Sequence, residues 1–315
     1  MMKSLLLNKS FLFGISFITI LFLSSIFYYL IYDDHIPQPG MEIRYDQEGQ
    51  LLKSPYSPLV HPPFGTDPKG RDLFFIMLIG AKYTIGAAFI ITFCRIFISF
   101  LLGAIISLYV PKLFKVISTT SNSLSFFPFT ILCFFLLNWI LIHDFLHDGK
   151  FTFSLLERVL IMISVLIIFA VPTLTVLFSS EINNILKYEF IESSRILGGS
   201  NLHLFKNHIN PYILPQVFII YFREFTQVML LLAHLGIIGI FLGGGTPETD
   251  LFNKTKILSA SNEWSGLIGA WWSFIWTTYP WITFIPVLFF TITILAGKLI
   301  VLGLIEANKN NQKIN

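Results

Sequence analysis

Hydrophobic residues in this chain are gathered into long runs that short polar stretches separate. Six runs reach or exceed the roughly 20 mostly apolar residues that a helix needs to cross a bilayer. They lie at 11–32, 77–109, 114–142, 155–180, 213–242 and 279–304. The pattern predicts an all-α polytopic membrane protein with about six transmembrane helices.

The first run is preceded by Lys3 and Lys9, as in a secretory signal peptide. It is too long for the apolar part of such a peptide, and no small-residue cleavage site follows in "FYYLIYDDH". We therefore expect residues 1–32 to be a cytoplasmic tail and the first membrane anchor.

Composition supports the membrane class, since 54% of the 315 residues are hydrophobic and only 12% are charged. The Lys and Arg residues scatter and form no basic patch, so nucleic acid is not an expected partner. Cys94 and Cys133 lie inside apolar runs and are interpreted as small buried side chains.

The positions of Lys and Arg predict the orientation, because these residues favour cytoplasmic loops. With alternating spans, one side receives both termini and most basic residues between spans, namely Lys112, Lys115, Lys187, Arg195 and Lys206. We predict cytoplasmic termini in the cell membrane, an extracytoplasmic loop at 33–76, a transmembrane domain at 77–305 and a cytoplasmic tail at 306–315.

The polar segment between spans four and five, at 182–212, has the pattern of a helical elbow. Residues 186–197 form one predicted helix, with Phe190, Ser193, Ser194 and Leu197 on one face and Glu192 and Arg195 on the other. Gly198 and Gly199 are expected to end it.

A second short helix should follow the glycines. Ser200 or Asn201 is its expected cap, and its apolar face is Leu202, Phe205 and Ile209. Pro211 and Pro215 are expected to break the chain before span five. A plain surface loop is the alternative, but a capped amphipathic elbow favours a docking surface.

The same segment resembles the coupling loop of ATP-binding-cassette (ABC) importer permeases. Glu192-Ser-Ser-x-x-x-Gly198, followed by Ile209-Asn-Pro211, is similar to the family's E-A-A-x-x-x-G and I-x-L-P elements. Ser193 and Ser194 replace two alanines and keep their small size, and Asn210 replaces a leucine.

Two further stretches resemble the oligopeptide, dipeptide and nickel class of these permeases. "HPPFGTDPKGRDLF", residues 61–74, is similar to the family's H-P-F-G-T-D-x-x-G-R-D. "LLAHLGIIGIFLGGGTPE", "EWSGLI" and "YPWITFIPVLFF" are similar to its E-A-S-L-S-F-L-G-L-G, P-S-W-G and P-W elements, although His234 and Leu235 depart from them.

The resemblance implies a type I ABC importer permease fold over 77–305, and a transport subunit that is no enzyme. It implies a second homologous permease, two cytoplasmic ATPase subunits that bind ATP and Mg²⁺, and an outer solute-binding protein, with no cofactor in this chain. Coupling would use Glu192, Ser193, Ser194, Gly198, Ile209 and Pro211. The substrate would be a peptide, nickel or a metal chelate.

The outer motif has a physical interpretation of its own: Asp67 caps a helix in which Pro68 is the first residue. A structural role is favoured over substrate contact for its residues Gly65, Thr66, Asp67, Gly70, Arg71 and Asp72.

Four polar residues fall at membrane depth, where charges are costly and are functional candidates: Arg95, Arg223, Glu224 and His234. Lining of a translocation path and pairing between helices are equally compatible with them. Arg223 and Glu224 are neighbours and do not face each other, so each should have a separate partner.

"HDFLHD" sets His143 and His147 four residues apart, a spacing that can hold a metal, in a loop where polar residues are expected anyway. It keeps open a multispan membrane enzyme, and a non-transporting sensor subunit is a third alternative. The chain contains no phosphate-binding G-x-x-x-x-G-K-[ST] motif, so any ATP hydrolysis is expected in partner subunits.

Overall fold

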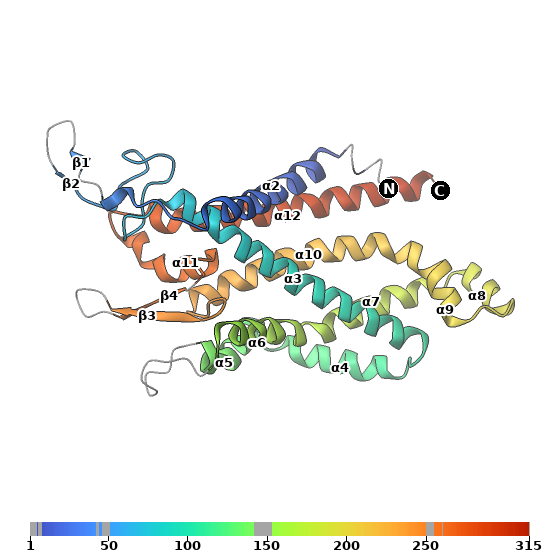
Figure 1. The fold of residues 1–315 in the computed structure, drawn as a ribbon. Coiled ribbons are helices and arrows are strands. Elements are labelled where there is room, and N and C mark those ends of the chain that lie inside the picture. The colour runs from blue at the N-terminus through green and yellow to red at the C-terminus, as the bar shows by residue number, and fades with distance from the viewer. Residues whose placement is uncertain are drawn as a thin grey trace.

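The computed structural model describes residues 5, 8–41, 44–45, 51–141, 153–249, 255–259 and 261–314. These residues form an elongated helical bundle (Figure 1). Its helices are α2 (Lys9–Tyr32), α3 (Leu73–Leu108), α4 (Leu113–Ser125), α5 (Phe129–Leu141), α6 (Leu155–Ile168), α7 (Val171–Ile185), α8 (Glu189–Ile196), α9 (Asn201–Leu204), α10 (Asn210–Ile237), α11 (Trp264–Trp271) and α12 (Trp281–Ile314).

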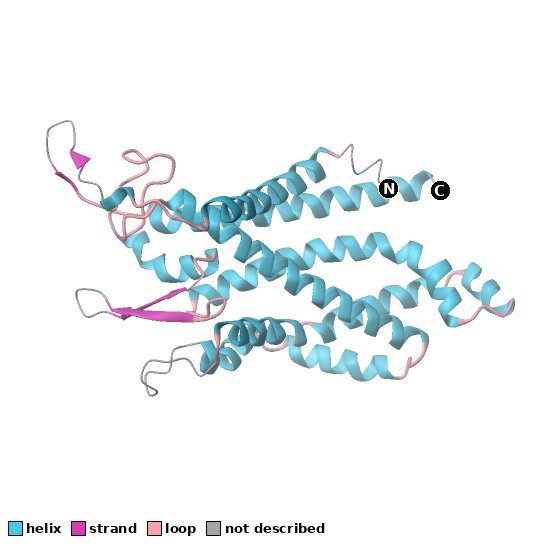
Figure 2. Cartoon of the chain, viewed as in Figure 1, coloured by secondary structure: helices cyan, strands magenta, loops and turns pink. Residues whose placement is uncertain are grey.

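The fold is all-α, as predicted, and two short hairpins lie in the connections between its helices. Figure 2 shows two small antiparallel hairpins at one end. One pairs β1 (Arg44–Tyr45) with β2 (Leu51–Leu52), and the other pairs β3 (Gly245–Thr249) with β4 (Thr255–Ser259). Each hairpin lies in a connection between helices, where strand pairing satisfies backbone groups locally.

Among the described residues, four helical stretches are long and apolar enough to cross a membrane, or up to six if each of two bent pairs counts as one span. The four are Lys9–Tyr32, Leu73–Leu108, Asn201–Ile237 and Trp281–Asn310. These helices are consistent with a multi-pass membrane protein.

The third and fourth predicted spans are broken, which corrects the expectation of continuous helices. α4 and α5 meet at 83°, and α6 and α7 meet at 41°. Pro128 directly precedes α5 and Pro172 lies in the first turn of α7. Proline lacks an N–H and clashes with the preceding helical turn, so each proline starts a new helix.

Two other boundaries differ from the prediction. α3 begins at Leu73, four residues before the predicted start of span two, because the Asp72 carboxylate caps it by accepting from the Phe74 N–H at 2.8 Å. α12 continues to Ile314, so the predicted tail at 306–315 is almost entirely helical.

α2 and α12 pack along each other through small residues. A side chain at Gly14 would come within 2.5 Å of the Ala296 carbonyl oxygen, and one at Gly303 would meet the Phe11 Cβ at 2.6 Å. Near the same end, the Asn8 amide donates to the Glu306 carboxylate at 2.6 Å. The first and last of the bounded helices are therefore in direct backbone-level contact.

The two ends of the bundle carry different elements (Figure 1). Both termini lie at the end that carries α8 and α9, together with the turn between α3 and α4. The hairpins, α11 and the segment after α2 lie at the other end. This agrees with the predicted arrangement of loops, while the direction in which the bundle faces the cytoplasm stays a prediction.

Candidate functional site

The polar segment between α7 and α10 folds into the predicted elbow, with small changes in its limits. α8 begins at Glu189, three residues after the predicted start, and ends at Ile196. Gly198 has φ +86, and its N–H donates to the Arg195 carbonyl at 2.9 Å. The Gly199 N–H donates to the Ser194 carbonyl at 3.0 Å. These two bonds form a Schellman cap, which requires the left-handed glycine.

The second arm begins where the sequence predicts. The Ser200 hydroxyl accepts from the His203 N–H at 3.3 Å, so Ser200 is the cap of α9. A π-helical turn, η2 (Phe205–Ile209), then leads directly into α10. The prediction that Pro211 and Pro215 break the chain is wrong. Pro211 lies in the first turn of α10, where its missing N–H is tolerated, and Pro215 lies inside the helix.

The elbow is fixed firmly to the bundle by buried side chains from both arms. Ile191, Leu204 and Ile209 are completely buried, in a core shared with Phe178 of α7. The Asn201 amide donates to the Leu108 carbonyl at the end of α3 at 2.9 Å. A movement of this elbow would therefore act directly on α3, α7 and α10.

The outer side of the elbow exposes large apolar residues. The exposed fractions are 81% for Ile196, 88% for Leu197 and 68% for Leu202. We call Ile196, Leu197 and Leu202 the apolar tip. The predicted apolar face of the first arm is not the one that packs, since Leu197 is exposed while Ile191 is buried. On the second arm, Phe205 and Ile209 pack as predicted, but Leu202 is exposed and Leu204 is buried in its place.

The predicted coupling residues occupy different surroundings within the elbow. Glu192 and Ser193 are exposed, and the Ser193 hydroxyl donates to the Glu189 carbonyl at 3.0 Å. Ser194 is half-buried and lies 3.3 Å from His208 Nε2 on the second arm. Its small side chain allows the two arms to approach, as expected of a small residue at this position.

Two of the four polar residues at membrane depth form a pair that the sequence analysis did not connect. Arg95 of α3 is 3% exposed, and its Nη1 lies 3.5 Å from Oε2 of Glu224 in α10. Arg95 Nε and Nη2 both donate to the Leu166 carbonyl of α6, at 2.9 and 2.6 Å. The structure thus supports interhelical pairing for Arg95 and Glu224.

Arg223 and His234 are placed differently, on the exposed side of α10. Gln227 and Leu230 continue the same stripe at intervals of three or four residues. Among the described residues, neither Arg223 nor His234 has an ion-pair partner. Polar groups at this depth avoid lipid, so the stripe is suited to face water or another chain.

The outer motif folds into a compact turn around Asp67, which is completely buried. The Asp67 carboxylate accepts from the N–H groups of Lys69 and Arg71, at 2.9 and 2.8 Å, and from Arg71 Nε at 2.7 Å. Gly65 and Gly70 both have positive φ. Asp67 therefore closes its own turn and is not the cap of a helix, which corrects the predicted role of Asp67 and Pro68.

The neighbouring motif residues tie this turn to the rest of the outer end. The Thr66 hydroxyl accepts from the Tyr56 N–H at 2.7 Å, and the Thr66 carbonyl accepts from Trp281 Nε1 at 3.4 Å. Asp72 Oδ2 lies 2.9 Å from His61 Nε2 while its other oxygen caps α3. The motif is used structurally, as the sequence analysis favoured.

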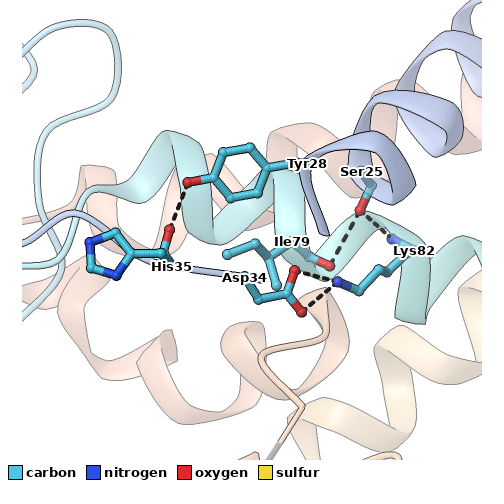
Figure 3. A network of polar contacts seen from close by, with 6 residues as sticks. All are labelled: Ser25, Tyr28, Asp34, His35, Ile79 and Lys82. Atoms are coloured by element: carbon cyan, nitrogen blue, oxygen red, sulfur yellow. Dashed lines mark hydrogen bonds and ion pairs between the residues drawn. The ribbon is translucent and has the colours of Figure 1, made fainter. Parts of the chain in front are cut away.

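A second polar cluster, which sequence reasoning missed, joins the end of α2 to α3 (Figure 3). The Asp34 carboxylate accepts hydrogen bonds from Lys82 Nζ. The Ser25 hydroxyl accepts from the Lys82 N–H at 3.1 Å, and the Tyr28 hydroxyl donates to the His35 carbonyl at 2.6 Å. Asp34 falls in the predicted loop at 33–76, and the sequence does not show its partner because Lys82 is distant along the chain.

Glu263 is a third feature that sequence reasoning missed. It is 1% exposed and precedes α11. Its carboxylate accepts from the Leu242 N–H at 3.0 Å and from the hydroxyls of Ser259 and Ser261. Burial raises the pKa of Glu263, and these hydrogen bonds partly oppose the shift. The Glu263 carboxylate therefore holds the two ends of the connection between α10 and α11 together.

Within the part of the chain that the structure describes, no group of three or more His, Cys, Asp or Glu side chains could hold a metal ion. His143 and His147 lie outside the described residues. Cys94 is half-buried and Cys133 is buried, and both are free thiols.

Comparisons with protein families and curated sequences do not assign this chain to a family. No protein-family model matches the chain, and no curated protein sequence is significantly similar to it. The function is therefore argued from the elbow, the buried charges and the arrangement of the helices.

Proposed function

We propose that this chain is the permease subunit of an ABC importer for peptides or a related small solute, such as nickel or a metal chelate. The elbow would dock on one of two partner ATPase subunits, and the translocation path would form between this chain and a second permease. ATP and Mg²⁺ would bind to the partner subunits, and an outer binding protein would deliver the solute.

One observation carries the proposal: a rigid elbow whose inner side is buried and whose tip is apolar and exposed. The buried anchors Ile191, Leu204 and Ile209 hold the elbow to three long helices. The apolar tip leaves three large side chains in contact with solvent at one end of the bundle. Adjacent exposed apolar side chains of this kind mark an interaction surface.

The mechanism follows from these connections. When the ATPase subunits close around ATP, the docked elbow moves with them as a unit, because buried side chains anchor both of its arms to the bundle. The movement passes to α7 before the elbow and to α10 after it. Tilting of these helices against a second permease changes the side from which the path is open. The exposed stripe with Arg223, Gln227 and His234 is suited to line that path.

The test is the ATPase activity that accompanies the full-length chain. We expect that the tagged chain, purified from its native membrane and reconstituted in nanodiscs, hydrolyses ATP through associated subunits. Leu197→Arg should remove this activity, because a charge at the tip opposes burial against the ATPase. The matched control is Leu59→Arg, which changes a leucine that is 93% exposed at the opposite end of the bundle.

Equal ATPase activity in the Leu197→Arg and Leu59→Arg preparations would argue against docking through the elbow. Absence of any associated ATPase from the unchanged chain would argue against the importer and would favour the sensor or enzyme alternatives. Membrane levels of each variant should equal that of the unchanged chain, since both positions lie outside the spans.

A further inference from the structure

One buried side chain contacts both helix breaks in the bundle. α4 and α5 break at 126–128, and α6 and α7 break at 169–170. Arg95 contacts both places: its guanidinium carbon lies 5.7 Å from the ring centre of Phe129, the first residue of α5, and its nitrogens bond Leu166 near the end of α6.

The Arg95 hydrogen bonds satisfy a carbonyl that the break leaves open. In a continuous helix the Leu166 carbonyl would accept from the Ala170 N–H. That N–H instead donates to the Ile167 carbonyl, at 3.1 Å. A carbonyl without a partner is costly inside a membrane. The guanidinium supplies two donors to it and offsets the loss.

Ser99, which lies four residues after Arg95 on α3, contacts the α7 side of the same break. Its hydroxyl donates to the Val171 carbonyl at the start of α7, at 3.3 Å. α3 therefore holds both flanks of the bend, the end of α6 through Arg95 and the beginning of α7 through Ser99. Contacts with α3, and not contacts within the α6–α7 pair, therefore fix the angle between α6 and α7.

Beyond the break, α7 is joined much more closely to α3 than α6 is. A side chain at Gly103 would meet the Phe178 Cβ at 2.9 Å. The Ser179 hydroxyl donates to the Gly103 carbonyl at 3.1 Å, and Ser107 donates to the Ser179 hydroxyl at 3.1 Å. α4 joins the same unit, since the Ser121 hydroxyl donates to Thr173 Oγ1 at 3.1 Å.

α5 and α6 pack against each other on the far side of both breaks. Arg95 gives this pair a polar attachment to α3 through the Leu166 carbonyl. Glu224 of α10 balances the Arg95 charge from a third direction. α5 and α6 therefore form a two-helix unit that the breaks at 126–128 and 169–170 separate from α4 and α7.

We propose that Arg95 is a positioning residue, the pin that holds the α5–α6 unit at a fixed angle to the α3–α4–α7 unit. The elbow is continuous with α7, so Arg95 determines how α5 and α6 move when the elbow moves α7. This inference concerns the chain alone and does not depend on whether the elbow docks an ATPase.

The test measures the bend directly by pulsed electron paramagnetic resonance. Spin labels are attached at Leu160→Cys in α6 and Leu177→Cys in α7, in a full chain with Cys94→Ala and Cys133→Ala, reconstituted in lipid nanodiscs. Both positions are exposed, and about 25 Å of helix separates them at 1.5 Å per residue. The unchanged Arg95 should give one narrow distance.

Arg95→Leu should broaden the distance distribution or add a second distance, because the Leu166 carbonyl loses both donors. Arg95→Lys should give an intermediate width, since a lysine keeps the charge opposite Glu224 but lacks the fork of donors. The matched control is Arg223→Leu, which removes a nearby arginine that is exposed on α10 and should leave the distance narrow.

If Arg95→Leu does not fold, the double variant Arg95→Leu/Glu224→Leu takes its place, because it leaves no buried charge without a partner. Broadening in this variant supports the pin. A narrow, unchanged distance in folded Arg95→Leu or in the double variant overturns it. Equal broadening in Arg223→Leu also overturns it, since the effect would then follow from loss of any arginine at this depth.

Discussion

The elbow end and the opposite end of the bundle differ in which groups they bury. At the elbow, Leu197 is 88% exposed while Glu192 remains on the surface. At the opposite end, the carboxylates of Asp67 and Glu263 are buried and surrounded by donors, and Asp34 is bound by Lys82. The opposite end surrounds its buried carboxylates with donors, whereas the elbow keeps its carboxylate Glu192 exposed beside the apolar tip.

The largest expected difference between the two ends is in their accessibility from outside the cell. In a chain with Cys94→Ala and Cys133→Ala, we expect a membrane-impermeant maleimide to label Leu59→Cys in intact cells and not Leu197→Cys. The reason is that Lys and Arg residues are concentrated at the elbow end, and these residues favour the cytoplasmic side. Permeabilised cells should label at both positions, because both side chains are highly exposed. The reverse pattern in intact cells would refute the orientation and the coupling role together.

The second prediction concerns the buried carboxylate of the outer turn. Asp67→Ala removes the acceptor of two backbone N–H groups and of Arg71, so we expect it to lower the free energy of unfolding by about 3–5 kcal/mol. Denaturant titration of the purified chain in detergent measures this. Glu192→Ala is the control at the elbow, and its exposed carboxylate should change stability by less than about 0.5 kcal/mol. Equal effects would erase the contrast between the ends.

The third prediction concerns the glycine that ends α8. Gly198→Ala places a side chain at φ +86, which costs about 1–2 kcal/mol even though nothing lies within 4 Å of the new Cβ. We expect faster hydrogen exchange in the elbow, and a larger effect for Gly198→Val. Gly86→Ala in α3 is the control, since its new Cβ has ordinary contacts with Phe22 and alanine favours the helix. Unchanged exchange in Gly198→Val would show that the left-handed cap is not required.

The smallest expected effect is a change in pH dependence at Glu263. Burial raises the folded-state pKa of Glu263 above its ordinary value of 4.5. The folded state therefore holds a proton more tightly, and stability falls as pH rises from 4.5 to the folded-state pKa. Glu263→Gln should flatten this part of the profile of melting temperature against pH. An identical slope in both proteins would mean that Glu263 does not contribute to it.

Features that depend on neighbours in sequence could be predicted. The end of α8 at Gly198 and the cap of α9 at Ser200 follow from local backbone geometry, and the structure confirms both. A normal helical wheel predicted the apolar face of the second arm only in part, since it included Ile209 but placed Leu202 there in place of Leu204. The π-helical turn at 205–209 brings Leu204 and Ile209, five residues apart, to the same buried face, and it leaves Leu202 exposed.

Features that depend on distant partners could be predicted only in part. The sequence singled out Arg95 and Glu224 separately because a charge in an apolar run is conspicuous. It could not pair them, since the pairing depends on how α3 lies against α10. Glu263 escaped notice for the opposite reason: it follows a polar stretch, and only the fold shows that it is buried. Pro128 and Pro172 carried the signal for the two breaks within runs that hydrophobicity alone made continuous.

The contact between α2 and α12 has a consequence for the order of assembly during synthesis. α2 is made first among the bounded helices, but the close contacts at Gly14 and Gly303 belong to its packing against α12, which is made last. Until α12 is inserted, the main packing partner of α2 among these helices is α3. The nascent chain must therefore keep α2 in the membrane with one of its faces uncovered until α12 is inserted.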